Sequence, residues 1–459
     1  MKKKWKQTLT TLTISTIMGV SLFCTMPGAE KAHAAADIVI NETNFPDEVF
    51  RNYVTDNFDD NNNGVLEEAE IDAISEINVD GMGISSLKGI EYFSHLFILS
   101  CSNNNLTTLD ISQNTVLGIL TCTNNQLTTL DISKNTILSH LRCGFNNFTT
   151  LDVSNNTWLK TIYCEDTPLT SLDVSNNPDL LYLSVAQTNV ETIDVSQNPK
   201  LDLLFCGSTK IQSLDLSHNP ELRELRCGIN AITELDVSQN PKLQQLSCHN
   251  CQLTSLDISH NPLLTELQCG NNKLTHLDVS NNTALRMLWC EDNNFASLDL
   301  SNNTALNNLQ HWSSISAPLH KDGNGYSLDL SVFSLDKAKV GNVSNGSYNS
   351  ANGKIYLDTP LAVGDTLTYE YATGFGNDKM TVTVKISEVD SDTTTTEATT
   401  EASGSTSDTP PASEAGTTTA PATDNTSTPK TGDTTTPLLI LILSLCSVAG
   451  VLFMKKKIR

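Results

Sequence analysis

Hydrophobic and polar positions recur along the central part of this chain with a period of 21 residues. A clear copy spans residues 225–240 and reads Leu-Arg-Cys-Gly-Ile-Asn-Ala-Ile-Thr-Glu-Leu-Asp-Val-Ser-Gln-Asn. Within each copy, Leu-x-Cys and Leu-Asp-Val alternate apolar and polar residues, which is the period of a β-strand. Leu225 and Cys227 are therefore predicted to point inward, and Arg226 outward.

The repeat predicts a stack of short coils, one coil for each 21-residue copy. No copy has room for a helix of three turns, and each coil would bury its apolar residues only against its neighbours. We expect one parallel sheet on one side of the stack and short extended segments on the other. At about 4.8 Å per coil, ten regular coils would extend about 50 Å.

This pattern resembles the leucine-rich-repeat family in its short bacterial form, over roughly residues 77–312. The resemblance implies a mainly β fold whose body is a parallel β-solenoid. Residues 77–100 form an atypical first coil, as expected of a terminal repeat. A small helical module should precede the solenoid, at residues 37–76, and a small β-sandwich-like domain should follow it.

Residues 37–76 predict a helical cap with a metal-binding loop. Phe45-Pro46-Asp47 is typical of a helix start, and the segment 59–70 fits the calcium-loop pattern of EF-hands at every position. The resemblance implies a structural Ca²⁺ ion that clamps the cap onto the open end of the solenoid. The alternative is a polar turn that binds nothing. The expected ligands are Asp59, Asn61, Asn63, the carbonyl of Val65, Glu67 and Glu70.

Nine cysteines share one position of the repeat, with Val185 in the gap. Parallel neighbours hold their Cβ atoms near 4.8 Å, against about 3.8 Å in a disulfide, so we interpret them as small buried apolar residues. Cys251 instead occupies the position held by Asn230 and Asn272, where a side chain could tie the turns of adjacent coils. The nine are Cys101, Cys122, Cys143, Cys164, Cys206, Cys227, Cys248, Cys269 and Cys290.

Aspartate recurs in all ten regular coils. Carboxylates one strand spacing apart repel each other, so something must offset the repulsion. Three candidates are backbone N–H groups, nearby hydroxyls such as Thr233 and Ser255, and bound cations. The column comprises Asp110, Asp131, Asp152, Asp173, Asp194, Asp215, Asp236, Asp257, Asp278 and Asp299.

Specific recognition is expected on the outward positions beside the cysteine column, because these positions vary between coils. Three aromatic side chains should form an exposed cluster over three adjacent coils, flanked by two arginines, and a tryptophan provides a second anchor. Exposed aromatic and Arg side chains are typical interaction hot spots. The alternative is that they are scattered surface residues. This predicted ligand-binding face comprises Arg142, Tyr163, Tyr182, Phe205, Arg226 and Trp289.

Both ends of the chain carry export signals. Residues 1–34 read as a signal peptide, with lysines before the apolar stretch 9–23. Near the other end, the apolar run 438–454 and a basic tail predict a membrane segment that would be used only before sorting. A five-residue segment shortly before that run resembles the Gram-positive sorting signal, Leu-Pro-x-Thr-Gly. It comprises Thr428, Pro429, Lys430, Thr431 and Gly432.

The resemblance to a sorting signal implies that a sortase cuts after Thr431 and joins it to peptidoglycan. Thr428 departs from the usual leucine, which leaves the sortase class open, and an ordinary membrane anchor is the alternative. Residues 389–427 precede the signal, and from 390 onward they contain no Val, Leu, Ile, Met or aromatic residue, so a disordered stalk is expected. The segment 313–388 predicts strands at 326–332, 354–357, 366–371 and 380–386, loosely resembling Ig-like modules.

A formal charge of −24 argues against binding nucleic-acid phosphates. No nucleophile–base set or phosphate loop is evident, so we expect no enzyme activity. The predicted function, by resemblance to internalin-type adhesins, is that of a secreted, wall-anchored surface protein whose solenoid binds a protein or glycan. Two alternatives stay open: a structural wall or biofilm component that self-associates with calcium, and a glycan-binding accessory of a surface enzyme system.

Overall fold

The computed structural model describes residues 37–323 and 325–391. The predicted signal peptide, nearly all of the predicted stalk, and the predicted sorting signal 428–459 lie outside the described residues. Within the described part, no helix is both long enough and apolar enough to cross a membrane.

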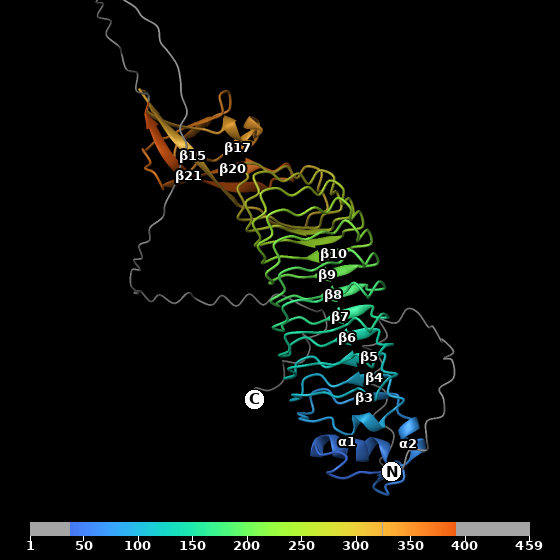
Figure 1. The fold of residues 1–459 in the computed structure, drawn as a ribbon. Coiled ribbons are helices and arrows are strands. Elements are labelled where there is room, and N and C mark those ends of the chain that lie inside the picture. Colours follow the sequence, from blue (N-terminus) through green and yellow to red (C-terminus); the bar gives the residue numbers. More distant parts are fainter. Residues whose placement is uncertain (1–36, 324, 392–459) are drawn as a thin grey trace, which may run out of the picture. The chain divides into compact units, whose positions relative to one another are not determined.

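The body of the molecule is a twelve-stranded parallel sheet built from one short strand per coil (Figure 1). Adjacent strands along the chain are neighbours in the sheet, so the predicted solenoid is confirmed. The strands are β3 Glu76–Asn78, β4 Ile98–Ser100, β5 Ile119–Thr121, β6 His140–Arg142, β7 Thr161–Tyr163, β8 Tyr182–Ser184, β9 Leu203–Phe205, β10 Glu224–Arg226, β11 Gln245–Ser247, β12 Glu266–Gln268, β13 Met287–Trp289 and β14 Asn308–Gln310.

The core consists of the repeated apolar positions. The middle residue of each strand pairs with the middle residue of the next, as Leu225 does with Leu246, and both are buried. Leu225 and Cys227 point inward and Arg226 is exposed, as the alternation predicts. All ten described cysteines are free and buried, which confirms the interpretation of the cysteine column as core.

Two columns of buried asparagine tie each coil to the one before it. In the first column, Asn125 Nδ2 donates to the carbonyls of Cys101 and Cys122, both at 3.0 Å. In the second, Asn156 Nδ2 donates to the carbonyls of Ile132 and Asn135, both at 2.9 Å. The first column gives the interior carbonyls of residues such as Cys101 and Cys122 a donor, and the second adds a bond to carbonyls that already accept a backbone N–H, as those of Ile132 and Asn135 do.

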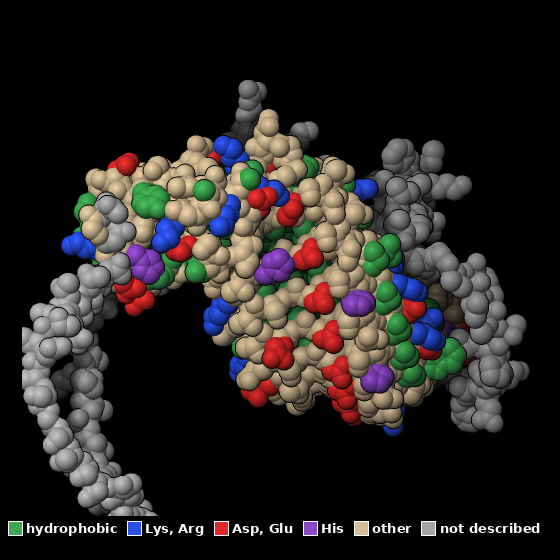
Figure 2. Space-filling view, turned by 90° about the horizontal axis from the view of Figure 1, so that it is seen from above, with side chains coloured by type: hydrophobic (Ala, Val, Ile, Leu, Met, Phe, Trp, Pro, Cys, Tyr) green, Lys and Arg blue, Asp and Glu red, His purple; other side chains and the backbone are tan. Residues whose placement is uncertain are grey.

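The aspartate column closes the turn that follows it. In every regular coil, one carboxylate oxygen accepts the backbone N–H of the serine two residues on, as Asp236 does from Ser238 at 2.8 Å. Backbone and side-chain hydrogen bonds from that serine lower the pKa of Asp236. Backbone N–H groups are therefore hydrogen-bond partners of the aspartate column, and they are one of the three candidates that the sequence analysis named for offsetting the repulsion. Figure 2 shows acidic side chains in a row across one face of the coils.

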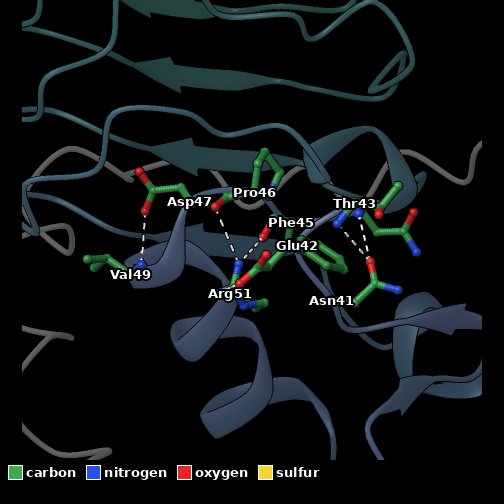
Figure 3. Close-up of polar contacts among 9 residues, drawn as sticks. Asn41, Glu42, Thr43, Phe45, Pro46, Asp47, Val49 and Arg51 are labelled. Atoms are coloured by element: carbon green, nitrogen blue, oxygen red, sulfur yellow. Dashed lines mark hydrogen bonds and ion pairs between the residues drawn. The ribbon is translucent and has the colours of Figure 1, made fainter.

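The cap consists of helix α1 (Glu48–Phe58), helix α2 (Glu68–Asp72) and a two-stranded sheet of β1 (Ile38–Val39) and β2 (Val65–Leu66). Asp47 caps α1, because its Oδ1 accepts the N–H group of Val49 (Figure 3) and that of Phe50, at 3.0 Å each. Its other oxygen, Oδ2, accepts from the N–H and the hydroxyl of Ser85 in the first coil, at 2.8 Å each.

Asp47 therefore both starts the helix and holds the cap to the solenoid. Burial alone would raise the pKa of Asp47, but the hydrogen bonds from Ser85, Phe50 and Ser86 outweigh it and the pKa is lowered. Arg51 supports the same corner, since its Nη1 donates to the carbonyl of Phe45 at 2.7 Å (Figure 3).

After the last coil, seven strands form one mixed sheet in the order β17-β20-β21-β15-β16-β19-β18. Four of them lie where strands were predicted, and Tyr369 of β20 donates its hydroxyl to the carbonyl of Ala296 in the last coils at 2.7 Å. The likeness of this region to Ig-like modules stays a prediction. The strands are β15 Ser313–Asp322, β16 Gly325–Asp329, β17 Val340–Gly341, β18 Ser347–Asn349, β19 Lys354–Tyr356, β20 Thr366–Ala372 and β21 Lys379–Ser391; short 3-10 turns are Ile90–Tyr92, Ser331–Phe333 and Lys337–Lys339.

Candidate functional site

Four of the six residues of the predicted ligand-binding face lie in one register across five neighbouring strands, β6 to β10. Arg142 pairs with Tyr163, and Phe205 pairs with Arg226, while Ser184 lies between the two aromatic residues. Each residue follows the buried leucine or isoleucine of its strand, so the alternation of the strand turns its side chain outward. The sheet thus holds two arginines at the ends of the row and two rings within it.

Each arginine stacks on the ring of its neighbour. The guanidinium carbon of Arg142 lies 4.8 Å from the ring centroid of Tyr163, and that of Arg226 lies 4.9 Å from the ring centroid of Phe205. Arg226 is also held by Glu224 on its own strand, through Nε and Oε1 at 2.6 Å. Cation–π contacts at exposed sites contribute about 0.5–1 kcal/mol, so their main effect here is to fix the orientation of both arginines.

The other two predicted residues lie outside this row. Tyr182 sits in the adjacent outward column, paired with Thr161 and Leu203, so it borders the row on the same sheet face. Trp289 lies four strands beyond Phe205, on β13, and its Nε1 donates to Asn308 Oδ1 at 3.0 Å. The structure therefore brings together five of the six residues and leaves Trp289 as a separate surface position.

The aromatic residues of the predicted ligand-binding face are less exposed than predicted. Tyr163, Tyr182, Phe205 and Trp289 are all half-buried. Ser184 is only 3% exposed although it occupies an outward position between Tyr163 and Phe205. Large rings beside a small residue lean over it and over their own sheet, which hides part of each ring and makes the surface flatter.

Sequence reasoning missed a half-buried carboxylate next to this row. Glu165 follows Cys164 and lies over Gly144 of the preceding coil, where an added Cβ would come within 2.7 Å of the Glu165 carbonyl oxygen and 3.1 Å of its Cδ. Burial raises the pKa of Glu165, and the charge of Arg142 opposes that rise. The sequence signal for this contact is a glycine that is followed by a large residue one period later. The same pairing recurs at Gly228 with His249 and Gly270 with Glu291.

Part of the predicted calcium loop converges. Asn61 Nδ2 donates to Glu67 Oε2 at 3.0 Å, and Asn63 Nδ2 donates to Glu67 Oε1 at 2.8 Å, so three of the six expected ligands touch each other. Oxygen-rich side chains gathered in one short loop suit a hard cation such as Ca²⁺.

The remaining ligands of the loop are bonded to its backbone. Asp59 accepts the N–H groups of Asn63 and Gly64 at 3.1 and 2.9 Å, and Glu70 accepts that of Asp60 at 2.8 Å. Val65 lies in β2, opposite Val39 of β1. Among residues 37–391, no group of three or more His, Cys, Asp or Glu side chains is arranged to hold a metal ion. Calcium binding by this loop therefore stays a prediction, which rests on the carboxylate, amide and carbonyl oxygens of the loop together.

Comparisons with known proteins agree with the repeat architecture. No protein-family model matches the chain. A segment of 71 residues is 37% identical to Internalin J of Listeria monocytogenes serotype 4b, covering 16% of this chain and 8% of that protein. A solved internalin, InlF, from Listeria monocytogenes strain 4b F2365 superposes with a TM-score of 0.59 at 22% identity, covering 62% of this chain and 87% of that one.

The chain has the leucine-rich-repeat fold and is similar to internalins. The likeness to InlF shows the fold, and the sequence match to Internalin J covers a small part of both proteins. The functional domain of InlJ from Listeria monocytogenes, which includes a cysteine ladder, gives a TM-score of 0.43 at 26% identity, over 77% of this chain and 99% of that domain.

Proposed function

We propose that this chain is a surface protein that binds a protein ligand through the row of arginines and rings on strands β6–β10. The observation that carries the proposal is the pair of cation–π contacts, Arg142 on Tyr163 and Arg226 on Phe205. Aromatic and Arg side chains dominate the binding energy of protein interfaces. Here the sheet orders them before any ligand arrives, which lowers the conformational entropy lost on binding.

Attachment to the cell wall is the second part of the proposal, and its support comes from the sequence. The segment 428–432 precedes an apolar run and a basic tail, which is the arrangement of a sorting signal. A sortase would join Thr431 to peptidoglycan, and the stalk before it would extend the solenoid away from the wall. We see no catalytic constellation among the described residues. An internalin-like solenoid of this kind would bind a ligand rather than catalyse a reaction.

Binding to intact cells tests both parts in one experiment. Cells that produce the wild-type chain would be incubated with surface proteins of host and neighbouring cells, and the retained proteins would be quantified. Joint replacement of Tyr163, Tyr182 and Phe205 by alanine should reduce retention of a genuine ligand at least about a hundredfold, because hot-spot residues each contribute about 2 kcal/mol or more. Deletion of residues 428–432 should move the chain and its ligand from the wall fraction to the membrane fraction, because the apolar run 438–454 remains.

A matched control uses outward positions on distant strands of the same sheet. Gln268→Ala and Gln310→Ala alter β12 and β14 and should leave retention unchanged. Equal retention by the triple variant and the wild type would rule out this face as the binding surface. A glycan array would distinguish the alternative, in which the half-buried rings stack on a sugar.

We also propose that Ca²⁺ stabilises the cap through the loop 59–70. The supporting observation is the contact of Asn61 and Asn63 with Glu67. Millimolar calcium should raise the melting temperature of the cap relative to chelator, because extracellular sites of this type have dissociation constants on the order of 10⁻⁴–10⁻³ M. Differential scanning calorimetry measures the shift.

Asp59→Asn and Glu70→Gln are the matched variants for calcium binding. Each removes one negative charge and keeps one of the two carboxylate oxygens that accept backbone N–H groups of the loop, so each should lose the calcium-dependent shift. Identical melting with calcium and with chelator in the wild-type chain would show that the loop is a polar turn without a metal.

A further inference from the structure

The exposed turn that leads into each strand has the same backbone hydrogen bond in all ten regular coils. The N–H of a buried leucine donates to the carbonyl of the asparagine three residues earlier, as Leu180 does to Asn177 at 3.1 Å. The residue before that leucine is exposed or half-buried at the tip of the turn. We call these ten residues the turn ridge: Val116, Ile137, Trp158, Asp179, Lys200, Glu221, Lys242, Leu263, Ala284 and Ala305.

The turn ridge has apolar ends and a charged centre. Trp158 is 62% exposed and Leu263 is 49% exposed. Between them the charge alternates in sign over four coils. Within the chain, Lys200 contacts Asp179 and Lys242 contacts Glu221, each at 2.5 Å, and all four side chains remain about half exposed.

The order of side chains along the turn ridge is complementary to the same order taken in the opposite direction. Around a two-fold axis placed between Lys200 and Glu221, each residue of the turn ridge meets a suitable partner from a second copy. Lys200 faces Glu221, and Asp179 faces Lys242. Trp158 then meets Leu263, Ile137 meets Ala284, and Val116 meets Ala305. We infer that the turn ridge binds a second copy of this chain in an antiparallel, two-fold symmetric dimer.

The charge pattern disfavours the two registers that are shifted by one coil from this one. A shift by one coil in one direction places Lys200 against its own copy and Asp179 against Glu221. The opposite shift places Glu221 against its own copy and Lys200 against Lys242. Like charges brought together in an interface cost several kcal/mol, so both shifted registers are rejected. A parallel in-register arrangement fails for the same reason, because every charge would face its own kind.

The next column toward the strands is compatible with the same axis. Asp202 and Arg223 occupy its two central coils and form an ion pair within the chain, and Asp202 is only 9% exposed, so this column adds no like-charge contact at the axis. Farther out, Lys160 would face Thr265, and no pair of like charges arises across the ten coils. The same patch serves both copies, which is how closed dimers form. Ten coils at about 4.8 Å give a contact line of about 45 Å.

The inference goes beyond the proposed function, because the turn ridge is separate from the row of arginines and rings. Sedimentation velocity of the full chain over a range of concentrations tests it. The wild-type chain should dimerise, and Lys200→Glu and Glu221→Lys should each weaken the dimer about a hundredfold or more. An equimolar mixture of these two variants should form a heterodimer, because each altered charge then faces an opposite one. Lys273→Glu, an exposed lysine outside the turn ridge, is the control and should dimerise as the wild type does.

Recovery in the mixture shows that both variants are folded and that the two positions face each other. If either variant fails to fold, Asp179→Lys mixed with Lys242→Glu provides a second complementary pair. Trp158→Ala should weaken the dimer about tenfold or more, as expected of an aromatic anchor. A wild-type chain that stays monomeric at about 100 μM, single variants that dimerise like the wild type, or a mixture without heterodimer would each overturn the inference.

Discussion

Replacing Asn156 by alanine is expected to lower the free energy of unfolding by about 2 kcal/mol. The side chain is fully buried and donates to the carbonyls of Ile132 and Asn135 in the preceding coil. Each carbonyl keeps one backbone bond, from Asn135 and Leu138, so neither is left without a donor. The Oδ1 atom of Asn156 has no partner within the protein, and its removal offsets part of the loss. Two hydrogen bonds at about 1 kcal/mol each therefore set the magnitude.

The adjacent residue provides a control of the same chemistry. Asn155 is exposed, so Asn155→Ala should change the free energy of unfolding by less than about 0.5 kcal/mol. Urea denaturation followed by circular dichroism compares the two variants with the wild type. Because stability in a solenoid is shared between neighbouring coils, the loss should appear as a lower urea midpoint for the coils around Asn156. Equal effects of the two substitutions would contradict the assignment of Asn156 as a tie between coils.

Alkylation of the cysteine column is expected to be at least about a thousandfold slower in the folded chain than in the unfolded chain at pH 8. Burial raises the pKa of Cys122 and of Cys206 to about 12. Only the thiolate reacts, so at pH 8 very little of either side chain is reactive, and access through the packed coils slows the reaction further. Iodoacetamide labelling with peptide-level mass spectrometry measures the rate for each cysteine.

Two comparisons make the alkylation experiment decisive. Cys251 is 8% exposed and lies at the turn rather than in the column, so it should react before the others. After unfolding without reductant, all ten described cysteines should be labelled, because all are free. Incomplete labelling in the unfolded chain would mean that some of them had formed disulfides. Rapid labelling of Cys122 in the folded chain would contradict its place in the core.

Much of the fold followed from the columns of the repeat. A residue that recurs every 21 positions meets its own copy in the next coil, so its burial can be inferred from its type alone. The recurring cysteines and leucines identified the core in this way. Cys251 was recognised as occupying the position at which asparagine links the turns of adjacent coils. The strand positions beside the cysteines were identified because they are the ones that vary. Contacts between residues of different columns were harder to predict, because the 21-residue period gives no information about them.

The C-terminal sheet shows where local pattern failed. Strand β15 was not predicted, because Pro318 lies inside it and proline cannot donate to a ladder. The structure accommodates the proline by a register shift between Ala317 and Leu319 in the pairing with β21. That pairing joins residues about 70 positions apart, so it is absent from any local window of sequence.

By itself, the sequence determined the solenoid, its inward and outward positions, and the order of charges along the turn ridge, because a strict period turns chain position into spatial position. Only the tertiary structure decided which arginine stacks on which ring, that Ser184 is covered, and that Glu165 lies half-buried over Gly144. Those outcomes depend on side-chain orientations between neighbouring coils. Packing sets them once the coils are stacked, and the repeat pattern leaves them open.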